Sequence, residues 1–239
     1  MRVAVVTDIH GNRRAFQAVL EDLRQVAPDL VVHGAIWCSA GHIRKEIIDE
    51  IRTLGWPGVL GNTDEMLWTQ ERPIEMASAH PHLASLLGRL QDMVAPMRAR
   101  IGNERLRWLR SLPTVQAGEG FAVVHARPKD LCRPQWPTPP MKKSKRRTWS
   151  WAFPWWSTDT FMFLMLGGAR NDGGKRGSVS QSYDGDRCAA YAVIEGEKVT
   201  IRRVEYDVES EAKELLHSGV PHAEWLSRIL LAGQYCRPG

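Results

Sequence analysis

The chain has 239 residues and a mass of 27.0 kDa, enough for one large domain with its own core. With 43% hydrophobic and 25% charged residues, its composition excludes a disordered or fibrous protein. The net charge of +5 and pI of about 9.2 would fit a nucleic-acid-binding protein, but seven basic and two acidic residues within 136–175 account for the whole excess. The rest of the chain is neutral, so nucleic acid is not the expected partner.

The N-terminal part alternates predicted strands and helices. RVAVVTD at 2–8 is a β-branched run typical of a buried strand, and the HGN turn that follows leads into a helix with one apolar face. DLVVHG at 29–34 predicts a second strand, KEIIDEIRTLG at 45–55 a helix capped by Gly55, and GVLGNTDEML at 58–67 a third strand that ends in a loop. This β-α-β-α-β order predicts a parallel sheet that binds ligands at the carboxyl ends of its strands.

The remaining elements complete a mixed α/β pattern. Residues 83–112 predict helix with a break near Pro96, and GFAVVHARP at 120–128 predicts a strand followed by a loop. Residues 188–208 predict a hairpin that turns at Glu195 and Gly196. Two amphipathic helices follow, at 209–219 and 222–233. We expect residues 1–239 to form a single domain.

Cysteine spacing and the N-terminus both favour a cytoplasmic protein. The four cysteines form no CxxC pair and lie far apart, which predicts free thiols: Cys38, Cys132, Cys188 and Cys236. The stretch MRVAVVTDIHGN has no apolar signal segment with a cleavage site.

Metal-binding residue types follow three of the predicted strands. Asp8 and His10 lie in TDIHGN, Asn62 and Asp64 in GNTDE, and His125 in VVHARP. Carboxylate, imidazole and amide oxygen ligands suit manganese, iron, nickel or zinc. Each motif alone is more often a capped turn or a surface group. Together, and each at a strand end, they predict a metal site at one edge of a sheet.

In this order, these residues resemble the calcineurin-like metallophosphoesterases, particularly their small bacterial and archaeal phosphodiesterases. Residues 177–196 and 204–230 also look like the C-terminal half of that group, so the resemblance covers the whole chain. It implies a four-layer α/β/β/α sandwich. It also implies two divalent metal ions (Mn, Fe, Ni or Zn) that hydrolyse a small phosphorylated substrate, a phosphodiester rather than a monoester. The resemblance predicts no membrane partner and is compatible with a homo-oligomer.

The resemblance assigns roles to individual residues. The predicted metal ligands are Asp8, His10, Asn62 and His125. Asn62 and Asp64 are the predicted catalytic residues, with Asp64 supporting the ligands through hydrogen bonds. Asn12 in the HGN turn is predicted to approach the phosphate of the substrate. Thr63 stands where many relatives have a histidine that assists the leaving group, so no residue is predicted for that role.

Two motifs of that family are missing. The chain has HGAIWCSAGHIRKEI at 33–47 where a bridging Asp in a GD motif is expected, and WSWAFPWWSTDTFMFLMLGG at 149–168 where both histidines of GHxH are expected. Codons permitted for AIWCSAGHI, read with a shift of two bases, encode GDLVLSGPH. Those permitted for WWSTDTFMFLMLGG encode VVYGHIHVPHVRR in the same phase. We therefore interpret residues 35–44 and 136–176 as compensated frameshifts, caused by sequencing errors or by lesions in the gene, which leave the metal centre impaired.

Other interpretations of 149–168 are weaker. Pro154 and Asp159 argue against a membrane-spanning helix. KKSKRR at 142–147 with the adjacent tryptophans would suit a membrane-surface anchor or a single-stranded nucleic-acid platform, but either would interrupt a catalytic fold. A non-catalytic scaffold with the same fold is the alternative function. Scaffolds are expected to lose ligands one at a time, whereas here whole segments change together, which favours a damaged enzyme.

Overall fold

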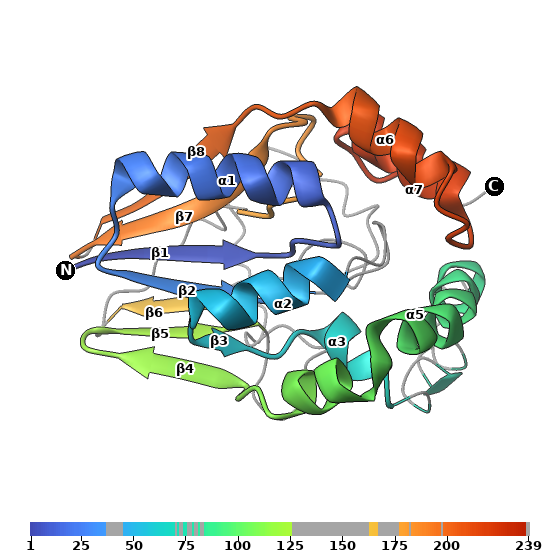
Figure 1. Ribbon diagram of the computed structural model, residues 1–239, viewed down its shortest axis with the longest axis horizontal. Helices are drawn as coiled ribbons and strands as arrows, with labels where there is room; N and C mark the ends of the chain where they lie inside the picture. The colour runs from blue at the N-terminus through green and yellow to red at the C-terminus, as the bar shows by residue number, and fades with distance from the viewer. Residues whose placement is uncertain are drawn as a thin grey trace, which may run out of the picture.

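The computed structural model describes residues 1–36, 45–69, 84–125, 177–181, 183–196 and 198–237, with a few positions between 71 and 81 and the backbone of 163–166. These residues form two β-sheets with strand orders β3-β2-β1-β7-β8 and β4-β5-β6. Helices pack on the larger sheet (Figure 1). The predicted mixed α/β class is confirmed, and three layers of the predicted sandwich lie within the described residues.

The larger sheet consists of β1 Arg2–Thr7, β2 Leu30–Gly34, β3 Gly58–Val59, β7 Ala189–Glu195 and β8 Lys198–Val204. The smaller sheet consists of β4 Val115–Gly118, β5 Phe121–Val124 and β6 Phe163–Leu166. The helices are α1 Arg13–Val26, α2 Lys45–Leu54, α3 Asn62–Met66, α5 Ala84–Arg110, α6 Val208–Leu216 and α7 Ala223–Ala232.

Strand β1 is the centre of the larger sheet. It pairs in parallel with β2 and antiparallel with β7, so that Val5 lies beside Val32 on one side and Ala192 on the other. Because side chains alternate along a strand, Val3 and Val5 belong to the core shared with Phe121 and Val123 of the smaller sheet, whereas Ala4 and Val6 face the helices. Both faces are buried, which explains the continuous β-branched run in the sequence.

Helix α1 is fixed to the rest of the chain near both of its ends. Asn12 caps its N-terminus by accepting a hydrogen bond from the backbone N–H of Ala15 at 3.0 Å. Near its C-terminal end, Asp22 accepts hydrogen bonds from the Tyr191 hydroxyl of β7 at 2.6 Å and from the Arg202 guanidinium of β8 at 2.6 and 2.7 Å. These charge-assisted bonds set the position of α1, and therefore of the turn that precedes it.

Two predicted boundaries were wrong. The break in the 83–112 region lies at Gly102, with φ 78° and ψ 159°, and not at Pro96. Glycine adopts positive φ without a steric penalty, so the chain can turn there more easily than at proline. The loop predicted after the third strand is the short helix α3, which begins at Asn62.

Two other predictions hold: the turn at Glu195 and Gly196 joins β7 to β8, and Gly55 follows the end of α2 with φ 66°.

Most of the two segments interpreted as frameshifts lies outside the described residues. Within them the structure describes only Ala35, Ile36 and strand β6. The 142–147 cluster and the tryptophans of 149–156 are also outside that description. None of the helices that the structure describes is both long enough and apolar enough to cross a membrane.

A buried histidine lies in the core at the end of β2. His33 is fully buried, and its ring centroid is 5.8 Å from that of Trp108. A Cβ on Gly58 would lie 2.1 Å from the His33 ring, so only glycine fits opposite it. Neither ring nitrogen has a hydrogen-bond partner among the described residues, and burial lowers the His33 pKa from 6.5 to about 4. The imidazole is therefore neutral in the folded protein at pH 7.

We predict that His33 contributes to acid denaturation. Between pH 6.5 and about 4 the unfolded chain binds a proton on this side chain and the folded chain does not, so stability falls as the pH is lowered through this window. His33→Leu should remove about 3 kcal/mol of that pH dependence, as expected for a shift of this size in a buried group. Urea denaturation at several pH values measures it, with His217→Leu as the exposed control. Equal acid slopes in wild type and His33→Leu would refute this explanation.

Candidate metal centre

Asp8 and His10 occupy a strained turn at the end of β1. Both residues have left-handed backbone conformations, with φ 55° and 52°, which are rare for side chains with a Cβ. Gly11 continues the turn with φ 69°. The turn brings Oδ1 of Asp8 within 3.6 Å of Nε2 of His10, and both residues are more than nine-tenths buried. Backbone strain of this kind is often retained at functional sites because it positions the side chains.

Asn62 and His125 form a second pair. Asn62 is the first residue of α3, shortly after β3, and His125 directly follows β5 in the smaller sheet. Oδ1 of Asn62 lies 3.0 Å from Nε2 of His125 and accepts a hydrogen bond from the backbone N–H of Thr63 at 2.7 Å. His125 is 2% exposed. The amide oxygen of Asn62 is thus held against an imidazole from the other sheet.

The two pairs lie close to each other. Burial is the main cause that lowers the His10 pKa to about 3, and the electrostatic influence of the nearby His125 ring lowers it further. Burial alone lowers the His125 pKa to about 3. Both imidazoles are therefore neutral at pH 7, the form that binds metal.

The donor atoms fit a divalent metal in part. Within the described part of the chain, Nδ1 of His10 and Nδ1 of His125 are buried and have no hydrogen-bond partner. An imidazole that binds a metal through one nitrogen usually donates a hydrogen bond from the other, so this feature does not favour a metal ligand. One carboxylate, two neutral imidazoles and an amide oxygen suit Mn, Fe, Ni or Zn. However, the described residues contain no group of three His, Cys, Asp or Glu side chains that could hold a metal ion. The predicted ligand roles of Asp8, His10, Asn62 and His125 remain predictions.

The end of β2 lies between these two pairs. The carbonyl oxygen of Gly34 accepts a hydrogen bond from the backbone N–H of Asp8 at 3.0 Å, and the N–H of Ala35 donates to the carbonyl of Val59 at 3.4 Å. Ala35 has φ 46°, in the region that favours glycine. A Cβ on Gly61 would lie 2.5 Å from Cβ of Ala35. A metal-ligating side chain on residue 36 would therefore leave the backbone at a point close to both Asp8 and Asn62.

Asp64 supports the turn that carries Asn62. It is fully buried, and Oδ2 accepts a hydrogen bond from the backbone N–H of Gly61 at 2.9 Å. This bond fixes the residue before Asn62 at the start of α3. Direct participation of Asp64 in catalysis stays a prediction.

The structure gives Asn12 a structural role. Its side chain is fully buried; Oδ1 caps α1, and Nδ2 donates to Oγ of Ser180 at 3.2 Å and to the hydroxyl of Tyr206 at 3.0 Å. These three bonds tie the turn after β1 to the C-terminal part of the chain. Contact of Asn12 with a substrate phosphate stays a prediction, and it would require at least one of these bonds to break.

Sequence reasoning missed the segment 177–181. Ser178 bridges Thr7 in parallel, and the backbone N–H groups of Val179 and Ser180 donate to the carbonyls of Thr7 and Asp8 at 2.9 and 3.2 Å. The segment therefore extends alongside the end of β1, next to the predicted ligands. The run of small polar residues in GSVSQS, shortly before a strong strand, could have indicated a strand-end loop.

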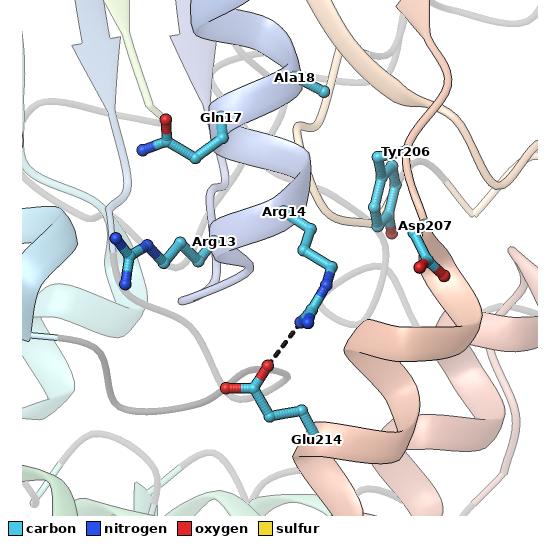
Figure 2. Close-up of a pocket in the computed structure, with 7 residues that line it drawn as sticks. All are labelled: Arg13, Arg14, Gln17, Ala18, Tyr206, Asp207 and Glu214. Atoms are coloured by element: carbon cyan, nitrogen blue, oxygen red, sulfur yellow. Dashed lines mark hydrogen bonds and ion pairs between the residues drawn. The ribbon is translucent and has the colours of Figure 1, made fainter.

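A pocket lies on the other side of the Asn12 turn. It has a volume of about 630 Å³ and is lined by residues of α1, the segment after β8 and the helix α6 (Figure 2). Arg14 extends from α1 toward α6, where it pairs with Glu214 at 2.5 Å and with the buried Glu211 at 3.1 Å. Tyr206 connects this pocket to Asn12 through its hydroxyl. The ion pairs hold α1 and α6 together beside the same turn.

Comparison with known proteins identifies the family of the chain. The sequence profile described as calcineurin-like phosphoesterase matches residues 1–201. The uncharacterised protein MJ0912 of Methanocaldococcus jannaschii is 26% identical over 265 residues, covering 97% of this chain and 98% of that protein. The crystal structure of a metallophosphoesterase from Sphaerobacter thermophilus superposes with a TM-score of 0.62 at 21% identity, covering 98% of this chain and 99% of that one. The chain belongs to the calcineurin-like phosphoesterase family.

Proposed function

We propose that this protein descends from a phosphodiesterase with a dinuclear metal centre and that the present chain is an impaired form of that enzyme. Family membership supports phosphoesterase chemistry and divalent metals. The proposal is supported by two residue pairs at strand ends, Asp8 with His10 and Asn62 with His125, and by the influence of His125 on the pKa of His10. The substrate class is a small phosphodiester.

The proposed roles follow from the geometry of the cluster. Two bound cations would activate water and offset the charge that develops on the phosphoryl group. Asp8 would supply anionic charge from β1, and His10 and His125 would offer neutral imidazole nitrogens without first losing a proton. The amide oxygen of Asn62 would exchange its contact with Nε2 of His125 for one with a cation. Burial of Asp8, His10 and His125 keeps water from these side chains and strengthens their electrostatic effect.

The backbone at position 35 supports the frameshift interpretation of 35–44. Read with the shift, the codons permitted here encode a glycine that ends within the codon of Ala35 and an aspartate that straddles Ala35 and Ile36. We place the pair at positions 35 and 36. Ala35 has the positive φ that glycine adopts freely, and Ile36 is 2% exposed at the point where the end of β2 meets the candidate ligands. A carboxylate there would lie between Asp8 of β1 and Asn62 after β3, as a ligand shared by two ions requires.

We predict that Ala35→Gly combined with Ile36→Asp strengthens metal binding. The added carboxylate supplies a ligand between the two pairs, so Mn²⁺ affinity should rise at least tenfold, or about 1.4 kcal/mol. Electron paramagnetic resonance of free Mn²⁺ measures the affinity, and hydrolysis of bis(p-nitrophenyl) phosphate measures the accompanying activity.

The matched control is Ala35→Gly with Ile36→Asn, which has the same shape without the charge. The wild type and this control should bind Mn²⁺ weakly and hydrolyse the diester slowly. If all three proteins bind Mn²⁺ equally well, the proposed position of the missing ligand is wrong. Efficient hydrolysis by the wild type would contradict the proposed impairment.

Peptide mass spectrometry of the native cells tests the frameshift interpretation of 136–176. We expect a tryptic peptide of the shifted frame that ends in a sequence close to YGHIHVPHVR, in place of the 148–170 peptide TWSWAFPWWSTDTFMFLMLGGAR. The peptides of 15–24 and 188–198, which lie in the undisturbed frame, serve as internal standards. Detection of the 148–170 peptide at the same abundance would show that cells make this segment.

A non-catalytic scaffold is the second candidate function. The observation in its favour is that no group of three His, Cys, Asp or Glu ligands exists within the described part of the chain. The two functions differ in the outcome of the same experiments: a scaffold would be present in cells with residues 148–170 intact, and it would gain little from the Ala35→Gly and Ile36→Asp pair.

A further inference from the structure

Gln181 lies at the edge of the sheet that carries the candidate metal ligands. The segment before it runs parallel to the end of β1, because Ser178 bridges Thr7 and the N–H of Ser180 donates to the carbonyl of Asp8 at 3.2 Å. The next residue along the chain is Gln181, which is 4% exposed. Its position was not predicted to be functional.

The side-chain amide of Gln181 has a hydrogen-bond partner for its oxygen but, among the described residues, none for its nitrogen. Its backbone N–H donates to Oγ of Ser178 at 2.8 Å, and its Oε1 accepts a hydrogen bond from the hydroxyl of Tyr183. Nε2 is buried and has no hydrogen-bond partner among the described residues. A buried donor without an acceptor lowers the stability of the folded protein.

Such a cost points to a ligand rather than to packing. The hydroxyl of Tyr183 holds Oε1, so Nε2 cannot turn to a new protein acceptor without breaking this bond. An uncharged donor in the segment that bonds to the end of β1 is suited to an oxygen of an anion held by cations at the strand ends. The neutral amide also adds no charge that would compete with a cation for Asp8.

We propose that Gln181 is a substrate-binding residue that donates a hydrogen bond from Nε2 to a non-bridging oxygen of the phosphodiester. This assignment rests on the proposed function, because it needs an anion at the strand ends. Gln181 orients the phosphoryl group, and Tyr183 orients Gln181. The amide makes no contact with the leaving group, so its contribution is the same for esters of different alcohols.

The test exchanges the unused donor and leaves the rest of the side chain in place. Gln181→Glu keeps an oxygen for the Tyr183 hydroxyl and replaces Nε2 by a second oxygen, whereas Gln181→Met removes both polar atoms at nearly constant length. Gln116→Glu and Gln116→Met are the matched controls on β4, where the side-chain amide donates to the carbonyl of Ala117 at 3.4 Å. The probe is dimethyl phosphate, a diester that persists during calorimetry. It is titrated with Mn²⁺ into the full chain that carries Ala35→Gly and Ile36→Asp, because the unaltered chain is expected to bind Mn²⁺ weakly.

We expect the dissociation constant for dimethyl phosphate to rise about tenfold in Gln181→Met and further in Gln181→Glu, because the glutamate oxygen repels the anion. Mn²⁺ affinity should be unchanged, and the melting temperature of Gln181→Met should be no lower than that of Gln116→Met. A purely structural role would lower the melting temperature and leave the dissociation constant alone, which overturns the proposal. Absence of dimethyl phosphate binding to a chain with Ala35→Gly and Ile36→Asp that does bind Mn²⁺ overturns it as well. Failure of the proposed function itself would be seen in a different result. Ala35→Gly with Ile36→Asp would then change neither the Mn²⁺ affinity nor the rate of diester hydrolysis.

Discussion

The site depends on how strand β1 ends. Both faces of β1 are buried and both edges are paired, so the strand cannot shift, and the chain must leave it through the turn at Asp8, His10 and Gly11 with positive φ at each. Asn12 then fixes the start of α1 and, through Ser180 and Tyr206, the C-terminal part of the chain. This arrangement brings two candidate ligands together without help from a metal.

The second pair of ligands depends on the smaller sheet. His125 approaches Asn62 because β5 packs against the larger sheet through Phe121 and Val123. The site is therefore a joint property of two sheets, and a change in their packing would separate the pairs. Buried, neutral imidazoles and a buried carboxylate carry an energetic cost in the folded protein. That cost is understandable if cations complete the cluster.

Much of this could be predicted from the sequence, for physical reasons. The alternation of strands and helices that starts with the β-branched run of β1 predicts the parallel sheet, and the end of that run predicts the position of Asp8 and His10. Both predictions succeed because hydrophobic periodicity and turn-forming residues depend only on neighbouring positions in the sequence. The full use of Asn12 in hydrogen bonds could not be predicted, because its partners Ser180 and Tyr206 are 168 and 194 residues away along the chain. Helix α3 and the break at Gly102 were missed because a five-residue helix and a single left-handed glycine leave no periodic signal. Gln181 is significant only through its burial, which the sequence does not contain.

The central claim is that the cluster of Asp8, His10, Asn62 and His125 is a metal site. Crystals of the full chain soaked in MnCl₂, with anomalous diffraction recorded above the manganese edge, test it most directly. We predict the strongest anomalous peak within bonding distance of Oδ1 or Oδ2 of Asp8 and a ring nitrogen of His10, and its loss in Asp8→Asn. A folded protein whose only manganese peaks lie on the surface, away from these residues, would contradict the account.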